Sequence, residues 1–134
     1  LSSGRVLFGT ATDDSHNYHD WLPHLSNPGR GWVMVGAKDL SIDAIVSALA
    51  TGEFYSSTGV ILGSYSQDDT KIEIQIQEER DFIYTTVFSG NNGDVLAQVS
   101  GLDASYKING NETYIRATIT SSSGGKAWTQ PVFV

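Results

Sequence analysis

The chain has 134 residues, no cysteine and a formal net charge of −7. The length suits one compact domain or two small ones. The lack of cysteine excludes disulfides and thiolate metal sites and is typical of a bacterial or cytosolic protein, although cytoplasmic and exported locations both stay open. The acidic balance argues against a nucleic-acid partner, which requires a basic surface. No apolar run is long enough to cross a membrane, so no membrane partner is expected.

An apolar run at residues 6–8 leads into a polar stretch, residues 9–21, that is rich in acids and histidines. The run predicts a buried strand that ends at Asp14 and His16. Because residues i and i+2 of an extended strand point the same way, we expect this carboxylate and this imidazole to be directed at one point. The two ligand types suit Zn, Mn or Fe. The alternative interpretation is a polar loop after a strand.

A metal site needs three or four ligands, so more ligands must come from nearby residues or from chain outside this sequence. Asp13 and Asn17 could orient the ligands through hydrogen bonds. Arg30, between two glycines, either binds a phosphate group bidentately or is an ordinary exposed arginine. The nearby candidates for additional ligands are His19, Asp20 and His24.

The sequence from Ser41 to Gly52 predicts the one clear helix. Ser41 is a suitable N-cap, apolar residues then recur with the helical period, and Gly52 is the expected left-handed C-cap. Residues 54–60 follow, with three hydroxyl side chains before Gly59. These hydroxyls either line a phosphate site or belong to a strand that leads into a turn.

The pattern changes to period two after residue 70. Ile72, Ile74 and Ile76 alternate with polar residues, which predicts a strand with its isoleucine face buried. About six strands at short spacing follow from such patterns and the turn sequences between them. We therefore expect an antiparallel, immunoglobulin-like β-sandwich over residues 67–134.

The stretch around Asp14 and His16 resembles the last metal-binding motif of the PHP (polymerase and histidinol phosphatase) family of metal-dependent phosphoesterases. The resemblance implies that Asp14 and His16 bind a divalent metal, Zn, Mn or Fe. It also implies an α+β protein, in which residues 1–66 form the last strand and helix unit of a PHP-type barrel and residues 67–134 form the β-domain that one branch of the family carries after its barrel. The other segments that resemble this branch are residues 28–33, 44–49, 52–59, 114–117 and 127–131.

The His-x-His motif that opens a PHP barrel does not occur in these residues. We therefore expect the C-terminal part of a longer phosphoesterase, inactive alone, whose partner is the missing N-terminal barrel and whose substrate is a phosphate ester or another small molecule. The alternative is a carbohydrate-binding, protein-binding or structural β-sandwich module, with exposed aromatic residues such as Trp128 as contacts.

Overall fold

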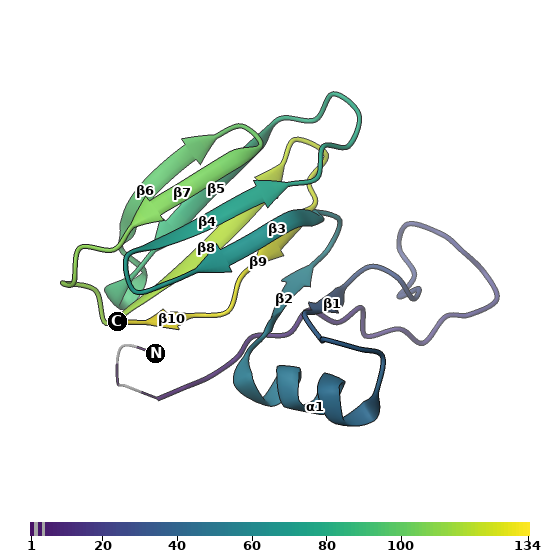
Figure 1. Cartoon of the computed structure of the whole chain (residues 1–134). Helices are drawn as coiled ribbons and strands as arrows, with labels where there is room; N and C mark the ends of the chain where they lie inside the picture. The colour runs from purple at the N-terminus through teal and green to yellow at the C-terminus, as the bar shows by residue number, and fades with distance from the viewer. Residues whose placement is uncertain (2, 4) are drawn as a thin grey trace.

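The described part of the chain, residues 1, 3 and 5–134, forms two packed β-sheets and one α-helix in the computed structural model (Figure 1). Strands β1 (Trp32–Val35) and β2 (Phe54–Ser57) flank the helix α1 (Ile42–Thr51) along the chain. The later elements are β3 (Leu62–Gln67), β4 (Lys71–Ile76), β5 (Tyr84–Ser89), the 3-10 turn η1 (Asn91–Gly93), β6 (Val95–Ser100), β7 (Asp103–Lys107), β8 (Tyr114–Ser121), β9 (Lys126–Trp128) and β10 (Val132–Phe133).

The strands form two antiparallel sheets that lie face to face (Figure 1). The larger sheet has the order β1-β2-β9-β8-β5-β6, with β10 paired to β8, and the smaller sheet has the order β3-β4-β7. The antiparallel β-sandwich expected from the sequence is therefore confirmed.

One sheet runs across the domain boundary that the sequence predicts. Strands β1 and β2 lie before that boundary, yet Ser56 of β2 pairs with Trp128 of β9. The boundary between residues 66 and 67 itself falls within β3. β1 and β2 pair antiparallel with each other, and the barrel unit expected over residues 1–66 stays a prediction.

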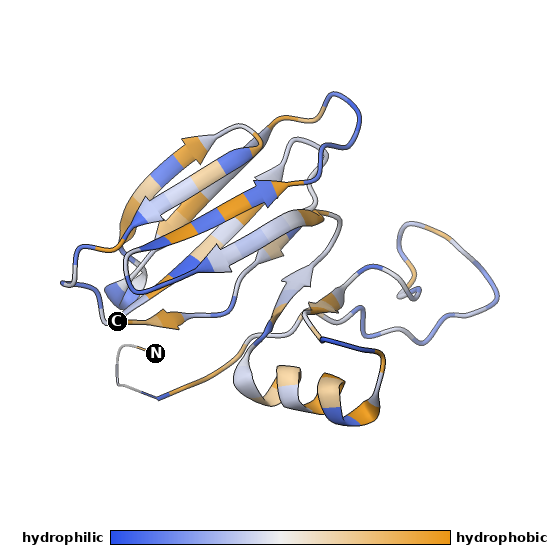
Figure 2. Ribbon diagram, viewed as in Figure 1, coloured by the Kyte–Doolittle hydropathy of each residue, from blue (hydrophilic) through white to orange (hydrophobic). Residues whose placement is uncertain are grey.

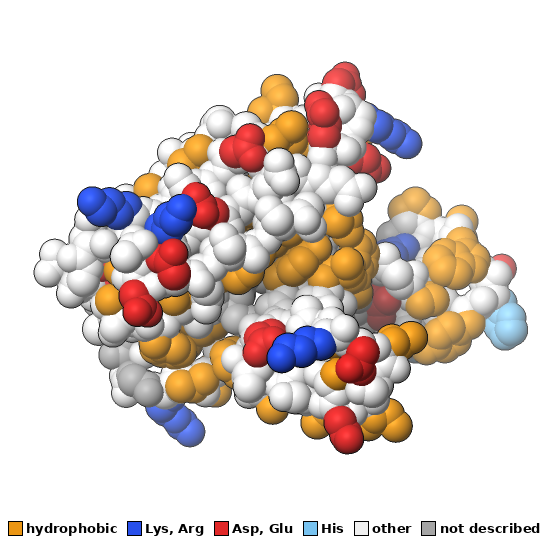
Figure 3. Space-filling model, in the orientation of Figure 1, with side chains coloured by type: hydrophobic (Ala, Val, Ile, Leu, Met, Phe, Trp, Pro, Cys, Tyr) orange, Lys and Arg blue, Asp and Glu red, His pale blue; other side chains and the backbone are white. Residues whose placement is uncertain are grey.

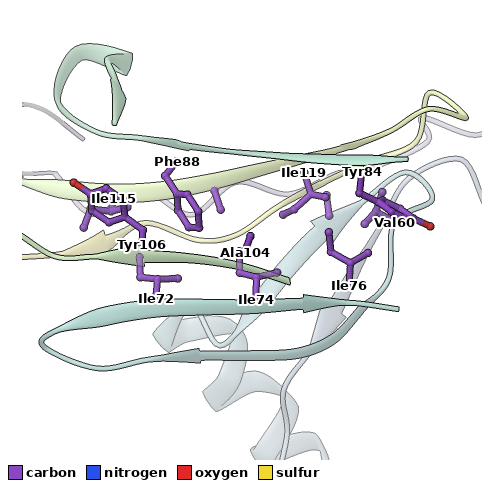
Figure 4. Packing of buried hydrophobic residues seen from close by; sticks show 12 residues of the cluster. Val60, Ile72, Ile74, Ile76, Tyr84, Phe88, Ala104, Tyr106, Ile115 and Ile119 are labelled. Carbon is purple, nitrogen blue, oxygen red and sulfur yellow. The ribbon is translucent and has the colours of Figure 1, made fainter. Parts of the chain in front are cut away.

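The core lies between the sheets, and the isoleucines of β4 form one wall of it. Ile72, Ile74 and Ile76 are between 1% and 3% exposed, which confirms the prediction from their period-two spacing; Figure 2 shows the alternation along β4. They point toward the larger sheet, where they share one cluster with Phe88 of β5 and Ile119 of β8 (Figure 4). The alternation of β4 thus decides which face of the smaller sheet turns inward.

Helix α1 begins and ends where the sequence predicts. The hydroxyl of Ser41 accepts a hydrogen bond from the backbone N–H of Ala44 at 3.2 Å, and Gly52 has the left-handed conformation of a C-cap. Among the residues that the structure describes, no helix is long and apolar enough to cross a membrane.

The buried strand expected over residues 6–8 is not formed, and that prediction is wrong. Val6 and Leu7 are each 60% exposed. The backbone of Gly9 forms hydrogen bonds with side chains and not with the backbone of a neighbouring strand. The side chain of Gln130 donates to the Gly9 carbonyl at 2.8 Å and accepts from the Gly9 N–H at 2.9 Å. Of the apolar run, only Phe8 is held in aromatic packing, edge-to-face on Phe54. A short apolar run does not determine what lies beside it.

Gly52 is expected to tolerate no side chain. Its φ is +83°, and a Cβ there would lie 2.5 Å from the ring of Phe8. Gly52→Ala should lower the free energy of unfolding by about 2–4 kcal/mol, because left-handed strain and overpacking add. Gly110→Ala is the matched control, since its φ is +80° with no atom within 4 Å of the added Cβ. Equal losses in urea unfolding of the two variants would contradict a steric role for Phe8.

Candidate functional site

The polar stretch after Thr12 forms a closed loop that stands away from both sheets (Figure 1). Its two ends touch: a Cβ on Gly31 would lie 2.9 Å from the carbonyl oxygen of Thr12, so only glycine permits this approach. Residues 13–30 are thus a compact loop of the kind that is held by its own side chains and is often functional.

Asn27 holds the interior of this loop. It is only 1% exposed, and its side-chain amide donates to the carbonyl oxygens of Asn17 and Asp20, both at 2.8 Å. The carbonyl oxygen of Ser26 accepts from the backbone N–H groups of His16 and Asn17, each at 3.0 Å. Because a buried amide must have partners, the side chain of Asn27 fixes the backbone at Asn17 and at Asp20.

The guanidinium of Arg30 is engaged within the loop. It donates to the side-chain oxygen of Asn27 at 3.1 Å and to the carbonyl oxygens of Leu22 and Pro23 at 3.0 and 3.2 Å. Arg30 therefore supports the loop, and any phosphate contact would share this guanidinium with those oxygens.

Asp13 closes the loop at its other end. Its carboxylate accepts a hydrogen bond from the backbone N–H of Gly29 at 2.5 Å, and this bond lowers the pKa of Asp13 below its usual value. The hydrogen bond joins the start of the loop to its end, and the role of Asp13 in orienting metal ligands stays a prediction.

Asp14 and His16, the predicted metal ligands, both lie at the surface of this loop. Asp14 has a φ of +46°, a left-handed conformation that aspartate adopts more readily than most residues. The chain is therefore not extended at Asp14, so the expectation that strand geometry aims the two side chains at one point is wrong. Their role as metal ligands stays a prediction.

The described residues do not complete a metal site. Over residues 1, 3 and 5–134, no three His, Asp or Glu side chains are grouped closely enough to hold a metal ion. The three additional candidates, His19, Asp20 and His24, are exposed in the same loop. Asp14 and His16 offer one carboxylate and one imidazole, which suit a divalent metal as part of a ligand set.

Two of the three hydroxyl side chains at residues 56–58, those of Ser56 and Ser57, are buried and hydrogen-bonded inside the protein. Ser57 donates to the carbonyl oxygen of Val60 at 2.7 Å and accepts from the N–H of Gly59 at 3.0 Å. Ser56 donates to the carbonyl oxygen of Gly9 at 2.8 Å. The interpretation of this segment as a strand that leads into a turn is confirmed.

Sequence reasoning missed Asn27 and Gln130, which support this part of the molecule. Asn27 precedes Pro-Gly and carries a turn signal, but its residue type does not indicate that it is buried. Gln130 has no local signal, because its partner Gly9 lies 121 residues away along the chain.

Comparisons with protein-family models, with curated proteins and with solved structures find no match. The PHP family therefore stays a prediction that rests on the residues themselves.

Proposed function

We propose that this chain is the C-terminal part of a PHP-type metal-dependent phosphoesterase, in which Asp14 and His16 bind a divalent metal. The observation that carries the proposal is an Asp-x-His pair on a loop whose backbone is fixed by the buried Asn27. Supported side chains of this kind suit ligands, which must keep their geometry. When bound, the metal would activate water and neutralise charge on the phosphoryl group.

Exposed apolar side chains on the helix and on the loop, on either side of β1, support the proposal that this chain belongs to a longer protein. Contiguous exposed apolar side chains mark interaction sites, and those of α1 follow the i, i+4, i+7 spacing of one helical face. Figure 3 shows such side chains on the helix and on the loop. In the proposed function the rest of the barrel covers this surface and supplies the remaining ligands. The exposed residues are Ile42, Val46 and Leu49 on the helix, Leu40 before it, and Tyr18, Trp21 and Leu22 in the loop.

The chain on its own is expected to be inactive. With added Mn²⁺ or Zn²⁺ it should not hydrolyse p-nitrophenyl phosphate above background, because two ligands leave a metal too weakly held for catalysis. Asp14→Ala is the control and should give the same background. Metal-dependent turnover that disappears in Asp14→Ala would show a complete site and contradict the proposal.

In the protein expressed from the complete reading frame, His16→Ala is expected to lose bound metal and at least about 100-fold in kcat/KM, since even residues behind the ligands contribute 10–100-fold. Glu78→Ala is the control, an exposed residue outside this loop, and should keep both. Elemental analysis and phosphatase kinetics measure the two effects. Unchanged metal content and activity in His16→Ala would remove this residue from the site.

The second candidate is a binding or structural β-sandwich module, and the strand order favours it. If β1 and β2 are set aside, the order β3-β4-β7 against β9-β8-β5-β6 places the first, second and fifth strands together. We infer from this an immunoglobulin-like relation, which is common among binding modules. Loss of metal and activity in His16→Ala would favour the phosphoesterase over this candidate.

A further inference from the structure

The two sheets differ in width, and the difference leaves a groove. Beyond β9 the larger sheet continues into β2 and β1, whereas the smaller sheet ends at β3. A groove of about 520 Å³ separates β3 from β1, β2 and the end of α1. Figure 3 shows hydrophobic side chains gathered in the hollow between the sandwich and the helix. The main apolar lining residues are Phe8, Met34, Tyr55, Leu62, Tyr65 and Pro131.

Strand β3 turns an open edge toward this groove. It pairs with β4 alone among the described strands, and all six of its residues line the groove. The N–H of Leu62 donates across the groove to the hydroxyl of Tyr55 at 3.0 Å, so this edge faces β2. An unpaired strand edge is a template for a further strand.

The edge of β3 lacks the side chains that usually prevent strand addition, and one irregularity, between Leu62 and Ser64, interrupts its pairing with β4. Its sequence, Leu-Gly-Ser-Tyr-Ser-Gln, contains neither a charged residue nor a proline. The outer strand on the other side of the same sheet, β7, carries Asp103 and Lys107. Charges and prolines are the features that normally prevent edge pairing, so β3 is the open edge of the smaller sheet.

The interior of the groove is apolar. Tyr65 lines the groove although it is 38% exposed, and its hydroxyl donates to the side-chain oxygen of Gln67 at 2.5 Å. Across the groove, Met34 pairs with Tyr55 in the β1–β2 ladder, and both line it. A strand added beside β3 would therefore lay its inward side chains on Met34 and Tyr55.

Among the described residues, the charged side chains that line the groove and the hollow beside it are acidic. Glu53 lines the groove, and Asp68 and Asp69 line an adjoining hollow of about 630 Å³ that shares Phe8 and Pro131 with it. Of the described residues, no Lys or Arg lines either hollow. Charge complementarity favours a basic occupant over a second copy of this chain, whose net charge is also −7.

We propose that this groove binds an extended, basic segment of a partner protein, which adds to β3 as a fourth strand of the smaller sheet. Main-chain hydrogen bonds to β3 supply affinity, and alternate apolar side chains fill the groove. Lys or Arg side chains of the segment lie at the rim near Glu53. This inference does not depend on the proposed phosphoesterase activity.

The test is an NMR titration of the ¹⁵N-labelled chain with the acetylated, amidated peptide (Lys-Val)₃ and its acidic counterpart (Glu-Val)₃. The basic peptide should shift the amide signals of β3 and Tyr55, protect β3 amides from hydrogen exchange, and bind at least about tenfold more tightly than the acidic one. Equal binding of the two peptides, or shifts that leave β3 untouched, would overturn the proposal.

Two variants separate the groove from the rest of the surface. Glu53 is exposed. Glu53→Lys should lower the affinity for the basic peptide about tenfold, while the circular dichroism spectrum of the chain stays unchanged. Asp103→Lys on β7 is the matched charge control and should not change the affinity. Tyr65→Pro should abolish binding, because the register with β4 directs the N–H of Tyr65 toward the open edge and proline cannot donate to an added strand. Unchanged affinity of Glu53→Lys for the basic peptide would overturn the proposal. So would a dimer of this chain that forms through β3 and competes with the peptide.

Discussion

Phe88→Ala is expected to lower the free energy of unfolding by about 3–5 kcal/mol, the usual cost of removing a buried aromatic ring. Phe88 is 0% exposed in β5, and its ring lies 5.5 Å from that of Tyr106 on the facing sheet. The two sheets meet through this contact (Figure 4). Because the strands on both sides are fixed by their ladders, the cavity left by the ring cannot close fully.

Urea unfolding followed by circular dichroism measures the loss. Ile83→Ala is the control, since Ile83 is 70% exposed just before β5 and should change the stability by less than about 0.5 kcal/mol. A loss below about 1.5 kcal/mol in Phe88→Ala would mean that the sheets close over the cavity, contrary to the expectation of a rigid interface.

The sequence predicts those parts of the fold that local patterns determine. In β4 the alternation of Ile72, Ile74 and Ile76 assigns one face to the core, because a slip of one residue would expose all three. The sequence predicts the ends of α1 because Ser41 and Gly52 satisfy backbone groups of the adjacent helical turn, those of Ala44 and Ala48. In both cases the interaction partners lie close along the chain or follow a fixed period.

Other parts depend on distant partners that no local pattern reveals. β2 joins the larger sheet because Ser56 pairs with Trp128, 72 positions later in the numbering. Residues 6–8 have the composition of a buried strand, but their surroundings are set by segments at residues 52–54 and 130. Pairing between segments this far apart along the chain leaves no signal in a local sequence pattern.

In the candidate loop, too, the sequence predicts some features and not others. The residue types of Asp14 and His16 were sufficient to nominate them as ligands, because ligand chemistry is a property of the side chain. Their geometry was not predictable, since it depends on the left-handed backbone of Asp14 and on the buried amide of Asn27. Residue type thus indicates which ligand atoms a side chain carries, and the fold determines where those atoms lie.

Acidification is expected to destabilise the sandwich through Glu112, which is only 8% exposed between β7 and β8. Its carboxylate accepts hydrogen bonds from the hydroxyl of Tyr106 and from the backbone N–H groups of Asn109 and Asn111, the latter two at 3.3 and 3.0 Å. These bonds, with that from Tyr106 first, hold the pKa of Glu112 at about 2, below its usual 4.5.

The direction of the pH effect follows from this lowered pKa. The unfolded chain binds the proton near pH 4.5, whereas the folded chain resists it until about pH 2. The stabilisation is therefore fully present above pH 4.5 and is lost as the pH falls toward 2. Tyr106 also packs on Phe88, so protonation of Glu112 loosens a side chain at the centre of the sheet interface.

Glu112→Gln is expected to lower the free energy of unfolding by about 2 kcal/mol at neutral pH, because a charged acceptor is lost and nearby N–H donors are left without it. The variant should also lose much of the stability change that the parent chain shows in acid. Glu78→Gln, at an exposed glutamate, is the control for removal of one charge and should behave like the parent. Urea unfolding of the three proteins at about pH 7 and about pH 3 measures both effects. If Glu112→Gln retains the full acid sensitivity of the parent, another carboxylate is responsible, and the hydrogen bonds of Glu112 do not stabilise the fold in the way its pKa indicates.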